Sequence, residues 1–356
     1  MFLRAGAGGA GMDDADSREG DGAAEDADEG LTYAEAGVDV AASEAATAAL
    51  VARLGGASGD YAGMLDVGDR YLALSTDGVG TKILVADALD DYSTVGIDCV
   101  AMNANDLVAA GVRPRAFVDY LAVAEPDERV AAEVGEGLAV GAELAGAELV
   151  GGETAVMPEV VRGVDLAGTC AGLAPKDAVF AGEAEAGDAL VGWPSTGVHS
   201  NGLTLAREVV SRAGGYDEPC PFAGYDTLGE ALLEPTRVYA DLLDPMREAG
   251  VRAAAHVTGG GWRNLARMGA RRYEVTDAFE PPAVFEFLRE AGGVSDAELH
   301  RTFNVGTGFV AAVDPAAAEG LAAATDGRVV GRVEAGGGDE GLVAVRGLEL
   351  SGDAGG

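Results

Sequence analysis

The feature that most constrains the fold is an alternation of short apolar runs with stretches of helical period between residues 71 and 173. Because runs of four to eight apolar residues predict strands and a longer 3.6-residue period predicts helices, this segment is expected to alternate the two. The expected strands are 71–75, 116–121, 148–151 and 165–173, and the expected helices are 97–109 and 128–145. This order predicts an α/β-like or α+β domain.

The chain is expected to divide into two folded domains with a tail at each end. Residues 1–30 are mostly Gly, Ala, Asp and Glu, which cannot bury a core, so this acidic tail is predicted to be disordered. An N-terminal domain is predicted over 31–175 and a C-terminal domain over 176–347, followed by a frayed tail at 348–356. The expected elements of the second domain are strands at 189–193, 308–313 and 342–346 and helices at 203–213 and 236–249.

The composition limits the classes of function. The 356 residues carry a formal net charge of −36, and only two of the 24 basic residues are lysines. Such an acid excess, with Arg in place of Lys, indicates adaptation to a salt-rich cytosol and disfavours nucleic acid binding. The three cysteines form no CxxC pair, and no apolar run reaches the ~18 residues of a membrane span. We therefore expect a soluble, cytoplasmic protein in a reducing compartment, with no membrane partner.

The motif STDGVGTK, Ser75 to Lys82, follows the first predicted strand. Its backbone N–H groups, Thr81 and Lys82 are suited to phosphate, and Asp77 is suited to a divalent cation. The spacing does not fit a Walker A loop, and a simple glycine turn is the alternative. Because lysine is so scarce here, we favour a phosphate contact, and we expect Lys82→Ala to impair turnover while leaving folding almost unchanged.

Two further motifs place acids and amides among apolar residues. GIDCVAMNANDL, from Gly96 to Leu107, has helical period, and its oxygen donors could converge near one helix end; a solvated face with local caps is the alternative. Its polar residues are Asp98, Asn103, Asn105 and Asp106. LVGGETAVMP places Glu153 after an apolar run, at the expected carboxyl end of a strand, where sites of α/β sheets lie. A β-turn with an exposed Glu explains the same motif nearly as well.

Two glycine-rich loops carry two of the three histidines. STGVHSNG places Ser200 and Asn201 before a predicted helix, where backbone N–H groups bind anions, and His199 could move a proton. HVTGGG places His256 beside three glycines that permit a backbone to wrap a ligand. For His199 and for His256, the alternative is a structural role in which backbone groups supply the hydrogen-bond partners of the ring. The third histidine, His300, is expected to pack within the second domain.

These motifs, together with RTFNVGTGF and in this order, resemble the phosphoribosylformylglycinamidine cyclo-ligases, the aminoimidazole ribonucleotide synthetases of purine biosynthesis. The resemblance runs from about residue 33 to about residue 345. It implies a two-domain α+β subunit whose N-terminal sheet forms a barrel with that of a second subunit in a homodimer, and a C-terminal α/β sandwich domain. It also implies an ATP- and Mg²⁺-dependent ring closure of a nucleotide substrate, with ATP bound near the dimer interface.

The sequence departs from the bacterial pattern before STDGVGTK. Where the bacterial enzymes carry a GGFGG-type loop, this chain has Ser58-Gly59-Asp60-Tyr61, which is similar to the acidic GDDA loop of thiamine-monophosphate kinases and selenophosphate synthetases. Asp60 therefore becomes a candidate metal ligand. Val198 stands where the common cyclo-ligase motif has Pro. A kinase-type activity of the same superfamily, and a non-catalytic ATP-binding protein, remain alternatives.

The residues are assigned to roles as follows. The catalytic candidates are His199, His256 and Lys82, with His199 as the first choice of proton carrier and His256 as the second. The candidate metal ligands are Asp60, Asp77 and Asp106. The candidate ATP-binding residues are Asp77, Gly78, Gly80, Thr81, Lys82, Asp98, Asn103 and Glu153. The candidate contacts to the nucleotide substrate are Ser200, Asn201, Gly259 and Gly260.

Overall fold

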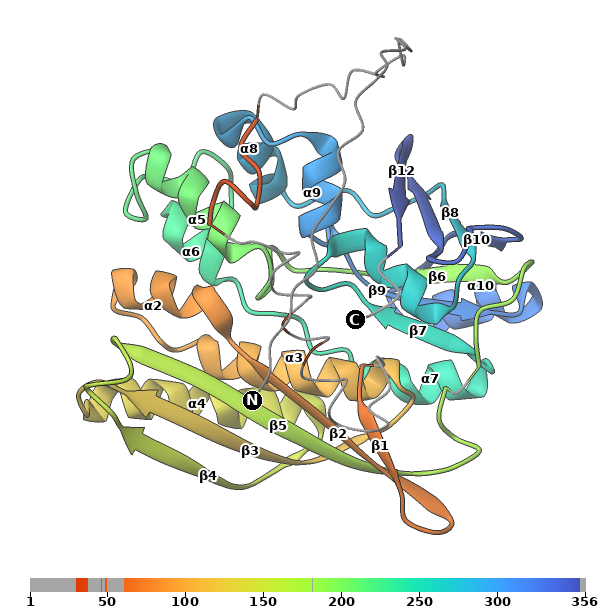
Figure 1. The fold of residues 1–356 in the computed structure, drawn as a ribbon, viewed down its shortest axis with the longest axis horizontal. Helices are drawn as coiled ribbons and strands as arrows, with labels where there is room; N and C mark the ends of the chain where they lie inside the picture. The colour runs from red at the N-terminus through yellow and green to blue at the C-terminus, as the bar shows by residue number, and fades with distance from the viewer. Residues whose placement is uncertain (1–29, 38–45, 47–48, 50–60, 181, 353–356) are drawn as a thin grey trace, which may run out of the picture.

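A computed structural model describes residues 30–37, 46, 49, 61–180 and 182–352. It shows two α/β layers, one from each half of the chain, that pack together with helix α3 (Val95–Ala109) between the two sheets (Figure 1). The predicted acidic tail up to residue 29 and the candidate metal ligand Asp60 lie outside the described residues.

The N-terminal half forms a five-stranded sheet in the order β1-β2-β5-β3-β4, with β3 and β4 parallel and the other neighbours antiparallel. Helices α3 and α4 lie against one face of this sheet (Figure 1). Helix α4 begins where the Asp127 carboxylate accepts from two backbone N–H groups, and it ends at Gly146 in the left-handed region. The elements are β1 (Gly63–Asp66), β2 (Arg70–Gly78), η1 (Gly80–Lys82), α2 (Ile83–Leu89), β3 (Pro114–Val123), α4 (Glu128–Ala145), β4 (Glu148–Val156) and β5 (Val164–Pro175).

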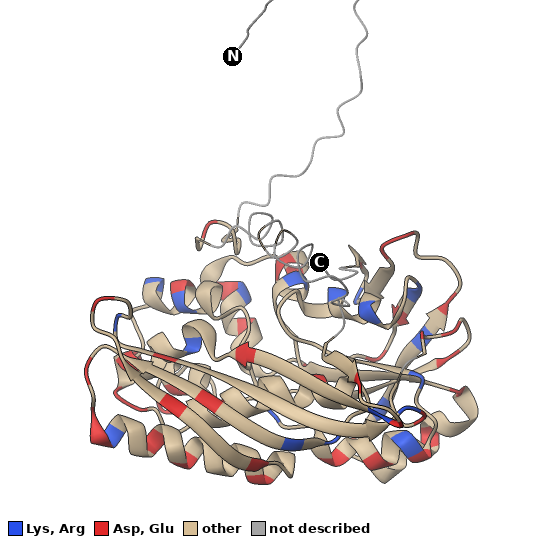
Figure 2. Cartoon of the chain, turned by 60° about the horizontal axis from the view of Figure 1, so that its bottom comes forward, with Lys and Arg blue, Asp and Glu red and all other residues tan. Residues whose placement is uncertain are grey.

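The two faces of this sheet differ in burial. On the helix side, alternate residues such as Ala73, Phe117 and Cys170 are fully buried. The residues between them on the other face include Leu65, Leu74, Val118, Tyr120 and Leu173, which are 39–59% exposed although they are apolar. We call this set the open face. Among the described residues, no helix covers it, and its strands carry fewer charges than the surrounding helices and loops (Figure 2).

The C-terminal half forms a seven-stranded sheet in the order β12-β11-β8-β10-β6-β9-β7. Its central strands β6 and β9 are buried along almost their whole length, because helices and the first domain cover both of their faces. The strands are β6 (Ala189–Pro194), β7 (Ala253–His256), β8 (Arg272–Val275), β9 (Thr307–Val313), β10 (Arg328–Glu334), β11 (Leu342–Val345) and β12 (Leu348–Ser351). The helices are α5 (Leu203–Arg212), α6 (Leu228–Leu233), η2 (Ala240–Leu242), α7 (Leu243–Glu248), η3 (Gly261–Met268), α8 (Ala283–Gly292), α9 (Asp296–Thr302) and α10 (Pro315–Ala324).

The α+β architecture with two halves, each built on its own sheet, is confirmed, but three local predictions need correction. Residues 348–351 are not frayed, because they form β12 and pair with β11. The helix expected at 236–249 is replaced by η2 and α7, which begin later. The backbone N–H groups of Thr236 and Tyr239 instead donate to side chains of α3, so these groups take no part in helical hydrogen bonds.

The third correction concerns Glu153. Strand β4 continues to Val156, so Glu153 lies within the strand, opposite Tyr120 of β3, and not at its carboxyl end. Because Tyr120 belongs to the open face, Glu153 lies on the same face.

None of the helices in the described part of the chain combines the length and the apolar character that a bilayer span requires.

Candidate active site

A cavity of about 660 Å³ lies where loops of the two halves meet. Three glycine-rich motifs contribute to its walls: the turn after β2, the loop before α5 and the loop before η3. Eight residues that the sequence analysis selected line it together: Asp77, Gly78, Gly80, Thr81, Ser200, Asn201, Gly259 and Gly260. Motifs that are more than one hundred residues apart in the sequence therefore form one site.

The glycines of these loops have a steric reason. Gly202 has a φ of +71°, and a Cβ there would lie 2.2 Å from the Phe303 ring. A Cβ on Gly261, whose φ is +57°, would lie 2.2 Å from the His300 carbonyl oxygen. Only glycine avoids both the strained backbone and the clash, which lets the two loops pass close to the elements behind them.

The N-terminus of helix α5 opens into the cavity. Ser200, Asn201, Leu203 and Thr204 line the wall around its first turn, and its N-cap Gly202 supplies no side-chain cap. The first N–H groups of a helix lack intrahelical partners and carry the positive end of the helix dipole. This wall is therefore suited to bind an anionic group such as a phosphate.

Charged residues that sequence reasoning did not select also line the cavity. Arg263 directly follows HVTGGGW, and Arg301 opens RTFNVGTGF, so both lie within motifs that the sequence analysis had quoted or beside them. Their position next to glycine-rich loops was the available signal. Glu298 accepts hydrogen bonds from the Tyr33 N–H at 2.9 Å and the Thr302 hydroxyl at 3.3 Å. The cavity thus combines two guanidinium groups with the carboxylates of Asp77 and Glu298.

Asp77, which lines the cavity, forms an acidic pair with Asp106, which does not line it. Burial raises the pKa of Asp77, and the neighbouring Asp106 carboxylate raises it further. Asp106 accepts a hydrogen bond from the Ser75 hydroxyl at 3.3 Å, and it lies 3.1 Å from Nδ1 of His256. Asn103 donates to the Asp77 carbonyl at 3.2 Å, and its buried Oδ1 has no hydrogen-bond partner.

This arrangement fits a hard divalent cation held jointly with substrate phosphates. A cation would stabilise the ionised form of Asp77, whose pKa is raised, and an unpaired amide oxygen is a ligand of the right chemistry. In the described ranges, no cluster of three or more Asp, Glu, His or Cys side chains forms a complete metal cage. Mg²⁺ does not require one, because it is commonly bound by one or two carboxylates, waters and substrate phosphates.

Lys82 lies away from the cavity. Its ammonium group is fully buried and forms an ion pair with Asp98 at 2.7 Å, and it donates to the Glu234 carbonyl at 2.7 Å. Asp98 also accepts from the backbone N–H and the hydroxyl of Thr236, at 2.8 and 2.6 Å. The structure therefore shows both side chains joining the two halves of the molecule, whereas the sequence suggested that they contact ATP.

Both candidate histidines are buried and neither lines the cavity. His199 has a φ of +63°, and its Nε2 accepts from the Thr196 N–H at 3.1 Å. Burial lowers the pKa of His199 well below its ordinary value, so its ring is neutral at neutral pH. His256 lies between Asp106 and Asn105, whose Nδ2 is 3.3 Å from its Nε2. His256 therefore orients the Asp106 carboxylate.

Comparisons with known proteins place this site in a family. The model for AIR synthase related proteins, N-terminal domain, matches residues 59–174, and the model for the C-terminal domain matches residues 185–344. The chain belongs to the AIR synthase related family. A relative named phosphoribosylformylglycinamidine cyclo-ligase, from Methanosarcina mazei, is 46% identical over 85% of this chain and 95% of its own. The resemblance read from the motifs is thereby confirmed.

Solved structures in this family's fold agree with the architecture. A protein named tt0281 from Thermus thermophilus superposes with a TM-score of 0.60 at 26% identity, over 86% of this chain and 97% of its own. A hydrogenase maturation protein, HypE, solved in complex with ATP, superposes with a TM-score of 0.57 at 19% identity, over 81% of this chain and 86% of its own. At 19% identity, the similarity to HypE shows only that the two proteins share a fold.

The family motifs divide into two groups in space. The glycine loops and the arginines line the cavity, where they can reach a ligand. The polar residues of α3 lie behind it in the interior. Asp98, Asn103 and Asn105 are fully buried, which excludes the solvated helix face that the sequence had left open. Each of them holds backbone groups of another segment.

Proposed function

We propose that this chain uses ATP to cyclise formylglycinamidine ribonucleotide to 5-aminoimidazole ribonucleotide, with release of ADP and phosphate, in purine biosynthesis. The observation that carries the proposal is the cavity in which the glycine loops of three separate motifs meet two arginines and the Asp77 carboxylate. The names of the 45–46% identical relatives support the same reaction.

The chemistry requires activation of a poor electrophile. The formyl amide oxygen of the substrate attacks the γ-phosphorus of ATP, and the bond from that phosphorus to ADP breaks. The amidine nitrogen then attacks the activated carbon and closes the ring, and phosphate leaves with the former formyl oxygen while the nitrogen loses a proton. Both steps move negative charge, so electrostatic stabilisation is the main task of the protein.

The cavity residues can be assigned to these tasks. The first turn of α5, with Ser200 and Asn201, binds the phosphate of the nucleotide substrate. The turn from Asp77 to Thr81 and the two arginines face the phosphates of ATP. Mg²⁺ would be held by Asp77 and Asp106, where it would offset the charge of the phosphates. Asn103 is a supporting ligand.

The proton carrier remains a choice between the two histidines. His256 contacts Asp106 directly, so it can receive a proton through that carboxylate or orient it. His199 is neutral, as a base must be, and although its Nε2 accepts from a backbone N–H, its buried Nδ1 has no hydrogen-bond partner. Both ring nitrogens of His256 are already engaged, by Asp106 and Asn105, so the contacts favour His199 in this role.

A homodimer built on the open face is part of the proposal. Five apolar side chains on the open face are 39–59% exposed, and large contiguous apolar patches on a soluble protein mark interaction sites. A second copy of the same sheet offers an equally apolar surface and would close the two half-barrels. Glu153 on this face would then lie at the interface.

The activity is tested with the full-length chain in molar KCl. We expect ADP release that requires both formylglycinamidine ribonucleotide and Mg²⁺, with formation of an aminoimidazole product, and loss of turnover in excess EDTA. Thiamine monophosphate and selenide serve as control substrates. ADP release with either control but not with the amidine would show a kinase-type activity, and ATP binding without product at any salt concentration would exclude the enzyme.

A pair of arginine variants tests the site itself. Arg301→Ala removes a guanidinium from the cavity, so kcat/KM should fall about 10- to 100-fold with unchanged unfolding temperature. Arg212→Ala, an equal change of charge at an exposed position of α5, is the matched control. Equal kcat/KM in both variants would remove Arg301 from the site.

A further inference from the structure

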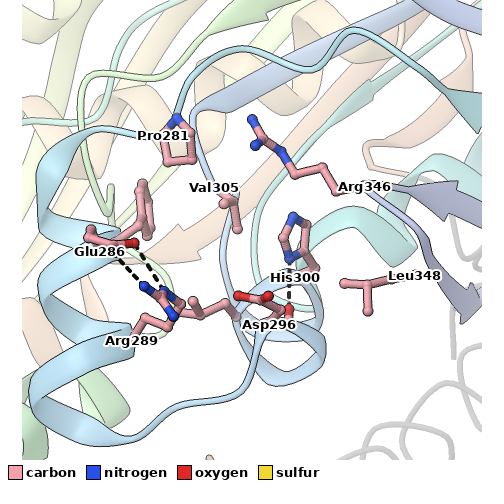
Figure 3. A pocket seen from close by; sticks show the side chains of 10 residues that line it. Pro281, Glu286, Arg289, Asp296, His300, Val305, Arg346 and Leu348 are labelled. Atoms are coloured by element: carbon pink, nitrogen blue, oxygen red, sulfur yellow. Dashed lines mark hydrogen bonds and ion pairs between the residues drawn. The ribbon is translucent and has the colours of Figure 1, made fainter.

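A second cavity of about 260 Å³ lies on the other side of helix α9 from the candidate active site. Glu298, Arg301 and Thr302 of α9 line the first cavity, whereas Asp296, Leu299 and His300 line the second. Helix α8 and the turn between β11 and β12 complete its walls (Figure 3). None of its lining residues belongs to the site described above, so it is a separate cavity.

His300 presents an unused hydrogen-bond acceptor in this cavity. The residue is only 4% exposed, and its Nδ1 lies 2.7 Å from the Asp296 carbonyl oxygen. Because a carbonyl can only accept, Nδ1 carries the proton and Nε2 is left with a bare lone pair in the neutral ring. Nε2 has no hydrogen-bond partner, and it points toward the space between Val305 and Arg346 (Figure 3).

The charged groups around the cavity define what could reach this acceptor. Arg289 is already paired with Glu286. Arg346, by contrast, donates to the Phe279 carbonyl at 2.7 Å and presents its remaining donors beside the His300 ring. Burial is the main cause that lowers the pKa of His300. The hydrogen bond to the Asp296 carbonyl and the Asp296 carboxylate, which also lines the cavity, oppose this shift, whereas the charge of Arg346 adds to it. The net direction is down, so the neutral form with its acceptor is favoured.

We propose that this cavity binds a compact anion that also carries a hydrogen-bond donor, of the hydroxycarboxylate or hydrogen-phosphate class. The anionic oxygens would bind Arg346, and the O–H group would donate to Nε2 of His300. Apolar contacts from Phe285, Leu299, Val305 and Leu348 exclude water from the rest of the ligand. A simple anion without a donor would leave the buried lone pair unpaired and would therefore bind more weakly. This inference does not depend on the reaction proposed above.

The test is a titration of the ¹⁵N-labelled full-length chain, followed by long-range ¹H–¹⁵N correlation of the imidazole nitrogens. The chain has only three histidines, so each ring can be assigned by substitution. Glycolate and inorganic phosphate are the probes, and acetate and chloride are the matched anions without a hydroxyl donor. We expect a saturable shift of the His300 Nε2 signal with glycolate, phosphate or both, and at least about tenfold weaker binding of acetate. Which of the two probes binds identifies the source of the anion.

Three variants, followed by calorimetric titration, distinguish recognition from structure. His300→Asn keeps a donor for the Asp296 carbonyl but lacks the acceptor, so binding should be lost, whereas His300→Gln can place an oxygen near the Nε2 position and should retain it. Arg346→Asn, at an exposed residue whose φ of +50° asparagine tolerates, should weaken binding at least about tenfold even if the histidine variants fail to fold. Arg212→Asn is the charge control. Equal binding of acetate and glycolate, no saturable signal with either probe, or an unchanged affinity in Arg346→Asn would overturn the proposal.

Discussion

The two sheets of this molecule differ in how completely their apolar side chains are buried. The central strands of the C-terminal sheet are covered on both faces within one chain, and β9 is buried at all seven of its residues. The N-terminal sheet is covered by α3 and α4 on one face only, and its other face leaves residues such as Leu65 59% exposed. The C-terminal sheet is complete in the monomer. Among the described residues, no element covers the second face of the N-terminal sheet.

The difference shows how each half contributes to the site. The C-terminal sheet supports the loops before α5 and η3, and the N-terminal sheet supports the turn at Asp77. The α3 side chains connect the two through buried hydrogen bonds to the segment 234–239. Stability of the cavity should therefore depend first on this junction. Next should come the burial of the open face against a second subunit, and last the long-range repulsion between the negatively charged subunits.

The largest effect is expected at the junction, from Lys82→Met. This change leaves Asp98 as an uncompensated buried charge, so the free energy of unfolding should fall by about 3–5 kcal/mol in denaturant titrations. Lys176→Met, at the only other lysine, which is exposed beside Asp66, is the control and should match the parent protein. If Lys82→Met instead keeps its stability and loses only turnover, Lys82 acts on phosphate as the sequence suggested.

A smaller effect is expected from Leu173→Glu on the open face. Leu173 is 48% exposed, so the folded monomer should tolerate the change, whereas two carboxylates facing each other in a paired sheet should raise the dimer Kd about 10- to 100-fold. Sedimentation velocity in molar KCl measures this. Val160→Glu adds the same charge at a residue that is 77% exposed outside the strands, and it should leave the dimer intact. Equal behaviour of the two variants would exclude the open face as the interface.

The smallest and most gradual effect is expected from dilution of salt. With a formal charge of −36 on each chain, two subunits repel more strongly as the Debye length grows from ~3 Å at 1 M to ~10 Å at 0.1 M salt. Dimer fraction and turnover should decline over the same range of KCl concentration, measured by sedimentation and ADP release. A fully active monomer at low salt would contradict both the interface and the dependence of the site on it.

Much of the fold could be read from local patterns. Helix α4 has the same bounds as its prediction, because a capping Asp127 and a left-handed Gly146 mark both ends in the sequence. Each glycine loop was also recognisable as a candidate ligand-binding loop, but only the structure brings the three loops to one cavity. The end of β4 and the strand β12 were missed, because edge strands and hairpins depend on partners that local sequence does not name.

By itself, then, the sequence determined the family, the order of the main elements between residues 71 and 173, and a set of candidate functional residues. Most elements of the C-terminal half, such as β7, β8 and β10, were not predicted. Only the tertiary structure decided where each of these residues lies and what it contacts. Lys82 lies in the same motif as Asp77 and Thr81, yet Lys82 is buried at the junction in an ion pair with Asp98, whereas Asp77 and Thr81 line the cavity. Arg263 and Arg301 come together in the cavity from separate motifs. The reason is physical: a polar side chain binds whatever the fold brings within hydrogen-bond distance, and that distance is set by packing between segments remote in sequence.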